Sequence, residues 1–175
     1  MRNQPSDYID VVDVMPRPVA GLCQRVPVRR LSPFIAEANP AVMDQLNRVG
    51  IVPVGPLMVV FREELDGTFT ATVGFPVQQV LMADALVHEH LPGGPAVRCL
   101  HTGPQVTLPA AYRRLNGWLA DRNLVLPSLS WEEHLVGPDV AGEGGRHTRV
   151  VVPLAWGDLG RMRGRAVSSD PYRIG

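Results

Sequence analysis

Apolar and polar residues alternate along the six residues from Ser130 to Leu135, SWEEHL in one-letter code. Successive side chains of a β-strand point to opposite faces, so this pattern predicts a strand. Glu132 and His134 would share one face of the strand, and Trp131 and Glu133 the other. Charged side chains are rarely placed inside a strand without a partner, and this strand is therefore the first candidate for a functional site.

A second pattern repeats apolar residues three and four positions apart and predicts a helix from Leu108 to about Asn123, with a proline in its first turn. An earlier segment is less regular. Ser32 can cap a helix there, whereas Pro40 is expected to break or kink it, with a second helical segment ending near Arg48.

The sequence contains an internal repeat of two copies. Met15–Val28 aligns without a gap on Leu91–Pro104, which places Cys23 over Cys99 at an interval of 76 residues (99 − 23 = 76). Two copies are too few for a solenoid, and they suggest a pseudo-symmetric pair instead. The two cysteines are expected at equivalent strand positions.

Together these patterns predict an α+β protein built of two pseudo-symmetric βαββ units in one domain, residues 1–156. The first unit is expected at about residues 8–77 and the second at about 84–156. Residues 157–175 are rich in glycine and arginine without periodicity, and we expect a flexible tail there.

Composition excludes several classes of function. Seventeen basic residues balance seventeen acidic ones, so no nucleic-acid or membrane surface is expected. Two cysteines make no disulfide framework, and neither a secretory leader nor an apolar run of membrane-spanning length is evident. A cytoplasmic protein is therefore expected.

Four stretches in this order, LPGGPAVRCLHTGP, LPAAYRRLNGWLADRNL, WEEHLVGP and HTRVVVPL, resemble the GyrI-like small-molecule-binding domain family. The upstream VGPLMVVF and TATVGFPV look like the first half of the same domain. This family supplies effector domains of multidrug-responsive and AraC-type regulators. The resemblance implies an antiparallel saddle around a central cavity that binds bulky hydrophobic ligands, often aromatic and cationic. It also implies a buried glutamate on a cavity strand.

The family motif Trp-Glu-x-Tyr places the cavity carboxylate at Glu132, with Trp131 beside it. This chain has His134 at the tyrosine position of the motif. It has Gln105 where the family often has another tyrosine, and Arg149 where the family often has a glutamate. The departures remove two rings and one acid, so avid capture of cationic dyes is not implied.

Two interpretations of Glu132 stay open. It can anchor a ligand cation or act as a base in a dry cavity. Alternatively it forms a structural ion pair with Arg149, on a strand expected to be its neighbour. Glu133 faces the other way and is interpreted as solvated. His134 can carry a proton or stack its ring on the ligand. Alternatively it is a hydrogen-bonded structural histidine.

Three aromatic residues are further candidates for the ligand site. Phe61 corresponds to Glu132 when Pro56 is aligned with Pro127, and it either forms the facing wall of the pocket or belongs to the core. Tyr112 has a hydroxyl that needs a partner when buried and can reach the cavity. Trp118 lies on the apolar helix face, where a core position is favoured over a ligand contact.

A metal site is not expected, although His88 and His90 share one strand face as zinc ligands can. Zinc would need a third ligand, such as His101, His134 or a cysteine, and solvated histidines are favoured. No cofactor-binding motif is present, and no cofactor is expected.

The leading hypothesis for function is a stand-alone protein that binds a hydrophobic drug or toxin. A second is a hydrolase that opens strained cyclopropane rings, with Glu132 activating water and His134 or Tyr112 donating a proton. A third is a protein-binding module that shields DNA gyrase. Direct contact with nucleic acid is not expected, since only seven residues precede the first predicted strand.

Overall fold

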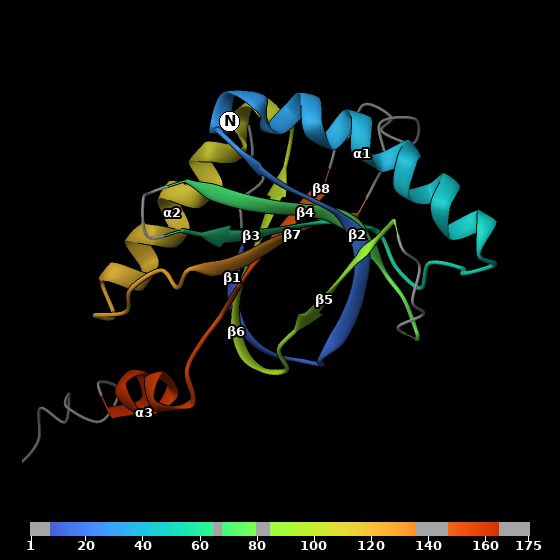
Figure 1. Ribbon diagram of the computed structural model, residues 1–175. Coiled ribbons are helices and arrows are strands. Elements are labelled where there is room, and N and C mark those ends of the chain that lie inside the picture. The colour runs from blue at the N-terminus through green and yellow to red at the C-terminus, as the bar shows by residue number, and fades with distance from the viewer. Residues whose placement is uncertain (1–7, 65–67, 80–84, 136–146, 165–175) are drawn as a thin grey trace, which may run out of the picture.

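A computed structural model describes residues 8–64, 68–79, 85–135 and 147–164 of the chain (Figure 1). In these ranges eight strands form one antiparallel sheet in the order β1-β6-β8-β7-β3-β4-β2-β5. The strands are β1 (Ile9–Val14), β2 (Arg17–Val26), β3 (Leu57–Glu63), β4 (Phe69–Pro76), β5 (Val87–Leu91), β6 (Gly94–Thr102), β7 (Leu129–His134) and β8 (His147–Pro153). The helices are α1 (Val28–Arg48), α2 (Leu108–Ala120) and α3 (Trp156–Gly164), and a 3₁₀ turn, η1 (Gln105–Thr107), precedes α2.

The sheet is a curled half-barrel with α1 and α2 on one side. Figure 1 shows α1 and α2 lying over the outer face, while β2, β5, β6 and β1 curve round beneath them. Apolar side chains fill the space under both helices, and a further cluster lies at the centre of the inner face. None of the helices described is long and apolar enough to span a membrane.

The strand order confirms the predicted duplication. It reads the same from either edge when β1 to β4 are exchanged for β5 to β8. The two βαββ units are β2-α1-β3-β4 and β6-α2-β7-β8. Each is preceded by one further strand, which crosses to the other unit: β1 pairs with β6, and β5 pairs with β2.

The two cysteines lie on corresponding strands but not on corresponding faces. Cys99 of β6 is buried against α2. Cys23 of β2 is exposed, and its neighbour Leu22 packs in the clusters beneath α1, so alternation turns Cys23 to the opposite face. The ungapped alignment therefore matches the right strands with side chains inverted, because a slip of one residue exchanges the two faces of a strand.

Helix α1 contradicts a break at Pro40, one of the two outcomes expected there, and it ends at Arg48 as predicted. It begins at Val28, four residues before the expected cap, and contains both Pro33 and Pro40. Pro40 is exposed and costs one backbone hydrogen bond. Ala38, Val42 and Leu46 are buried one turn apart on both sides of it, and their packing on the sheet keeps the helix continuous.

The C-terminal segment also differs from its prediction, because a short helix, α3, occupies residues 156–164 where a tail without structure was expected. Residues 165–175 lie outside the described ranges. So do Asp66 and Gly67, a pair typical of a turn, and residues 137–145, whose glycines are typical of a loop.

Candidate functional site

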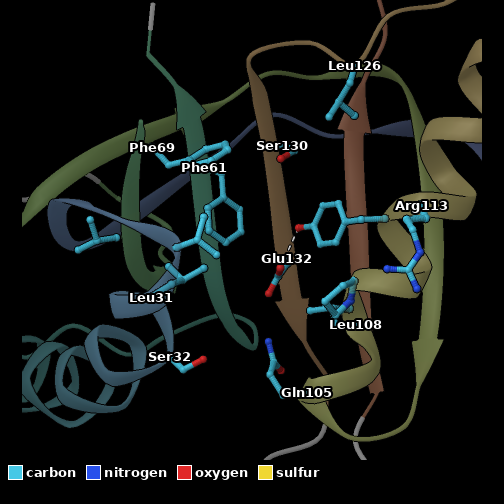
Figure 2. A pocket seen from close by; sticks show the side chains of 14 residues that line it. Leu31, Ser32, Phe61, Phe69, Gln105, Leu108, Arg113, Leu126, Ser130 and Glu132 are labelled. Atoms are coloured by element: carbon cyan, nitrogen blue, oxygen red, sulfur yellow. Dashed lines mark hydrogen bonds between the residues drawn. The ribbon is translucent and has the colours of Figure 1, made fainter. Parts of the chain in front are cut away.

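A pocket of about 480 Å³ lies between α1 and α2 on the outer face of the sheet (Figure 2). The first turns of both helices border it, and the central strands β3 and β7 form its floor. Its lining residues are mostly apolar or aromatic: Val26, Val28, Leu31, Ser32, Phe61, Phe69, Gln105, Leu108, Pro109, Tyr112, Arg113, Leu126, Ser130 and Glu132.

Glu132 is the buried charge of this pocket, with 3% of its surface exposed. Both of its carboxylate oxygens have a partner. The hydroxyl of Tyr112 donates a hydrogen bond to Oε1 at 2.7 Å, and Nε2 of His134 lies 3.2 Å from Oε2. The fold therefore brings together three of the predicted site residues, Glu132, Tyr112 and His134. His134 contacts Glu132 but does not line the pocket itself.

The hydroxyl of Tyr112 keeps its proton beside the carboxylate. Burial, followed by the negative charge of Glu132 and the hydrogen bond to it, raises the pKa of Tyr112 well above its ordinary value. The pair therefore combines a carboxylate with a neutral hydroxyl donor at one point of the pocket wall.

Arg149 corrects two interpretations made from the sequence. Its Nη1 donates to Oε2 of Glu133 at 2.7 Å, and Arg17 lies 3.5 Å from the other oxygen of Glu133. Glu133 is thus only 4% exposed on the inner face and is not solvated. The proposed structural pair between Glu132 and Arg149 does not form, because the two side chains leave the sheet on opposite faces.

Aromatic rings form one wall of the pocket. Phe61 lies opposite Ser130 in the β3–β7 ladder, and Figure 2 shows it with Leu31 and Phe69 on the side of the pocket away from Leu108. Phe61 also belongs to the apolar cluster beneath α1, so it is both pocket wall and core.

The two tryptophans named from the sequence do not line this pocket. Trp131 alternates with Glu132 and is buried on the inner face with Met58 and Val60. Its indole N–H has no hydrogen-bond partner in the described ranges. Trp118 packs against the cluster beneath α2, and the guanidinium of Arg122 lies 3.8 Å from the centre of its ring.

Sequence reasoning missed the contribution of the two helix N-termini. Leu31 and Leu108 face each other across the pocket from the first turns of α1 and α2 (Figure 2). They are 77 residues apart (108 − 31 = 77), so a repeat alignment at an interval of 77 rather than 76 would have paired them. No repeat or motif in the sequence indicated that Phe69 and Arg113 line the pocket.

The histidines considered as possible metal ligands do not form a cluster. His88 and His90 lie on β5 at the edge of the sheet, while Nε2 of His101 contacts the hydroxyl of Thr107 at 3.0 Å. Within the described residues no group of three or more histidine, cysteine or acidic side chains could hold a metal ion.

The fold and its pocket define an α+β domain of the ligand-binding class. The sequence matches the family model of the GyrI-like small molecule binding domain over residues 8–153, and the chain belongs to this family. No curated protein matches the chain by sequence.

Solved structures share the fold. The C-terminal domain of EcmrR is 16% identical with a TM-score of 0.72, and the similarity covers 86% of this chain and 98% of that domain. SAV2435 bound to tetraphenylphosphonium is 8% identical with a TM-score of 0.62, covering 87% of this chain and 96% of the other. A hydrolase encoded by lin2189 from Listeria innocua is 12% identical with a TM-score of 0.54, covering 86% and 93%.

Proposed function

We propose that this protein binds an apolar, aromatic small molecule, a drug or a toxin, between α1 and α2, with Glu132 as the polar anchor. The observation that carries the proposal is the position of Glu132. It is a buried carboxylate at the wall of an apolar pocket, held by a hydroxyl and an imidazole.

Burial of a carboxylate is unfavourable, and the fold does not require this one for an ion pair with an arginine. A ligand that offers a cation or an N–H group gains from it, since electrostatic attraction strengthens as water is excluded. The pocket volume of about 480 Å³ lies in the range of sites for drug-sized ligands, roughly 300–1,000 Å³. The tetraphenylphosphonium bound to SAV2435, four rings around a positive charge, supports an aromatic ligand for the shared fold.

A second candidate function is hydrolysis of strained cyclopropane rings. The hydrogen bond of 2.7 Å between Tyr112 and Glu132 favours it, because it joins a neutral proton donor to a carboxylate. Glu132 would take a proton from the attacking water, and Tyr112 would return one to the opening ring, whereas His134, the other donor considered from the sequence, does not line the pocket. Mass spectrometry of a cyclopropane-containing alkylator incubated with the protein tests this: a product heavier by one water supports hydrolysis, and unchanged alkylator refutes it.

Fluorescence of N-phenyl-1-naphthylamine, a neutral aromatic probe, tests binding in the pocket. Phe61→Leu removes a ring from the pocket wall and should weaken probe affinity by about fivefold, or roughly 1 kcal/mol. Val52→Ala changes an apolar side chain that is 76% exposed and away from the pocket, and it should leave affinity unchanged. Absence of binding to the wild type, or an equal response of both variants, would contradict the proposal.

A further inference from the structure

Ser130 places a buried hydroxyl in the floor of the pocket, and nothing described so far uses it. It lies on β7 two residues before Glu132, and strand alternation puts both side chains on the outer face, where both line the pocket. Only 9% of the surface of Ser130 is exposed. Figure 2 shows it on the same strand as Glu132, between Phe61 and Leu126.

The hydroxyl of Ser130 forms no hydrogen bond with the residues that the structure describes. Its oxygen is nevertheless open to the pocket, whereas the indole nitrogen of Trp131 on the opposite face is fully enclosed. Buried polar groups in proteins nearly always have a hydrogen-bond partner. A buried hydroxyl that lacks a partner and faces a cavity therefore points to a ligand.

The internal repeat supplies a comparison for this position. Strand β3 of the first unit corresponds to β7 of the second, and their ladder places Val60 opposite Trp131, 71 residues later (131 − 60 = 71). At the same interval Val59 corresponds to Ser130 (130 − 59 = 71). Val59 is fully buried in the apolar cluster beneath α1. An apolar side chain fills this position in one unit, so the pairing of the strands does not require the hydroxyl in the other.

The other uncharged polar side chains of the pocket are less suited to bind a buried acceptor. The hydroxyl of Tyr112 donates its proton to Glu132. Ser32 is exposed and Gln105 is half-buried, both next to the helix N-termini, so water competes for their hydrogen bonds. Among the described lining residues, Ser130 is therefore the buried side-chain donor that remains for a ligand.

We infer that Ser130 is a specificity-determining residue, whose hydroxyl donates a hydrogen bond to an acceptor oxygen of the ligand while Glu132 accepts one from an N–H group. This inference rests on the proposed function. The ligand would be an aromatic compound that carries both an N–H group and a carbonyl oxygen. Two residues of a strand span roughly 7 Å, so the two groups should lie about that far apart. Each carboxylate oxygen has two lone pairs, so Glu132 can accept this N–H group beside its bonds to Tyr112 and His134.

Two aromatic amines separate the acceptor oxygen from the rest of the ligand. 4-Aminobenzophenone and 4-benzylaniline have the same two rings and the same amino group, and a carbonyl in the first replaces a methylene in the second. Displacement of N-phenyl-1-naphthylamine measures the affinity of each. Ser130→Ala removes the hydroxyl. Ser128→Ala is the matched control, because it makes the same change at an exposed serine just before β7 that does not line the pocket.

The wild type should bind the carbonyl compound more tightly than the methylene compound. Ser130→Ala should reduce the ratio of the two affinities about tenfold, equivalent to about 1.4 kcal/mol. The loss should fall on the carbonyl compound alone, since the methylene compound makes no hydrogen bond that the substitution removes. Ser128→Ala should keep the wild-type ratio within about twofold. Ser130→Ala should also melt at the temperature of the wild type, because the hydroxyl has no partner in the fold.

An equal loss of both compounds in Ser130→Ala, or an unchanged ratio, would overturn the role of Ser130 while the proposed function stands. An unchanged ratio in a variant that melts at a lower temperature would assign the hydroxyl to the fold instead. An equal change of the ratio in Ser128→Ala would also overturn the inference. If N-phenyl-1-naphthylamine does not bind the wild-type protein at all, the proposed function and this inference fail together.

Discussion

Exchange of Glu132 for glutamine separates a functional carboxylate from a structural one. The amide has almost the same shape as the carboxylate and no charge. Its oxygen can still accept the hydrogen bond of Tyr112, and its NH₂ group can donate to His134 if that ring adopts the other tautomer. Because the local network can re-form, we expect the free energy of unfolding to change by less than about 1 kcal/mol.

Ligand affinity should respond more strongly than stability. Two unit charges about 4 Å apart attract each other by about 4 kcal/mol at an effective dielectric constant of about 20, and loss of hydration offsets much of this. We expect the affinity of Glu132→Gln for tetraphenylphosphonium to fall at least about tenfold, which corresponds to about 1.4 kcal/mol.

Glu133→Gln is the matched control, because it changes the adjacent carboxylate on the opposite face. It weakens the ion pairs with Arg149 and Arg17, whose side chains are 32% and 36% exposed. Breaking a fully buried pair costs about 3–5 kcal/mol, and partial exposure of the arginines should reduce this to about 1–3 kcal/mol. For a chain of this size such a loss lowers the melting temperature by about 2–12 °C.

Thermal melts and equilibrium binding of tetraphenylphosphonium, measured on both variants, give the decisive comparison. Glu132→Gln should lose affinity and keep its melting temperature, and Glu133→Gln should do the reverse. If Glu132→Gln loses more than about 3 kcal/mol of stability and binds the cation as the wild type does, the carboxylate is structural and the reasoning is refuted.

A further prediction concerns the hydroxyl proton that Tyr112 donates to Glu132. Because the pKa of Tyr112 is raised, its contribution to stability is complete below the unfolded-state pKa of about 10 and is lost as the pH rises toward the folded-state value. Absorbance at 295 nm should accordingly show one of the three tyrosines resisting ionisation, and Tyr112→Phe should abolish that step; ionisation of all tyrosines together would contradict it.

Periodicity in the sequence predicted most of the fold. The alternation around Glu132 is a property of the strand itself, and it assigns Glu132 and Glu133 to opposite faces without knowledge of the neighbouring strands. The partner of each carboxylate depends on the register between β7 and β8, which pairs Glu133 with Arg149 and Glu132 with Val150. The sequence of one strand does not contain that register, and the burial of Glu133 was therefore missed.

Helix α1 shows why local signals fail where tertiary packing dominates. Pro40 weakens a helix by about 3 kcal/mol or more in isolation. The buried side chains of Ala38, Val42 and Leu46 lie on both sides of it, and their contacts with the sheet offset this loss. The pocket itself lies between the first turn of this helix and that of α2. Its position depends on how the two helices pack on the sheet, and no local sequence pattern predicts that packing.

The crossing of β1 and β5 between the two units has a consequence for ligand entry. Six residue pairs join β1 to β6, and five join β5 to β2. A hinge motion that parted the two halves, as in clamshell-type binding proteins, would have to strip both of these strands from the sheet. The halves are interlocked, although each supplies one wall of the pocket. A ligand of the proposed site would therefore enter a cavity whose floor and carboxylate are already in place, and its affinity would reflect contacts made without the cost of domain closure.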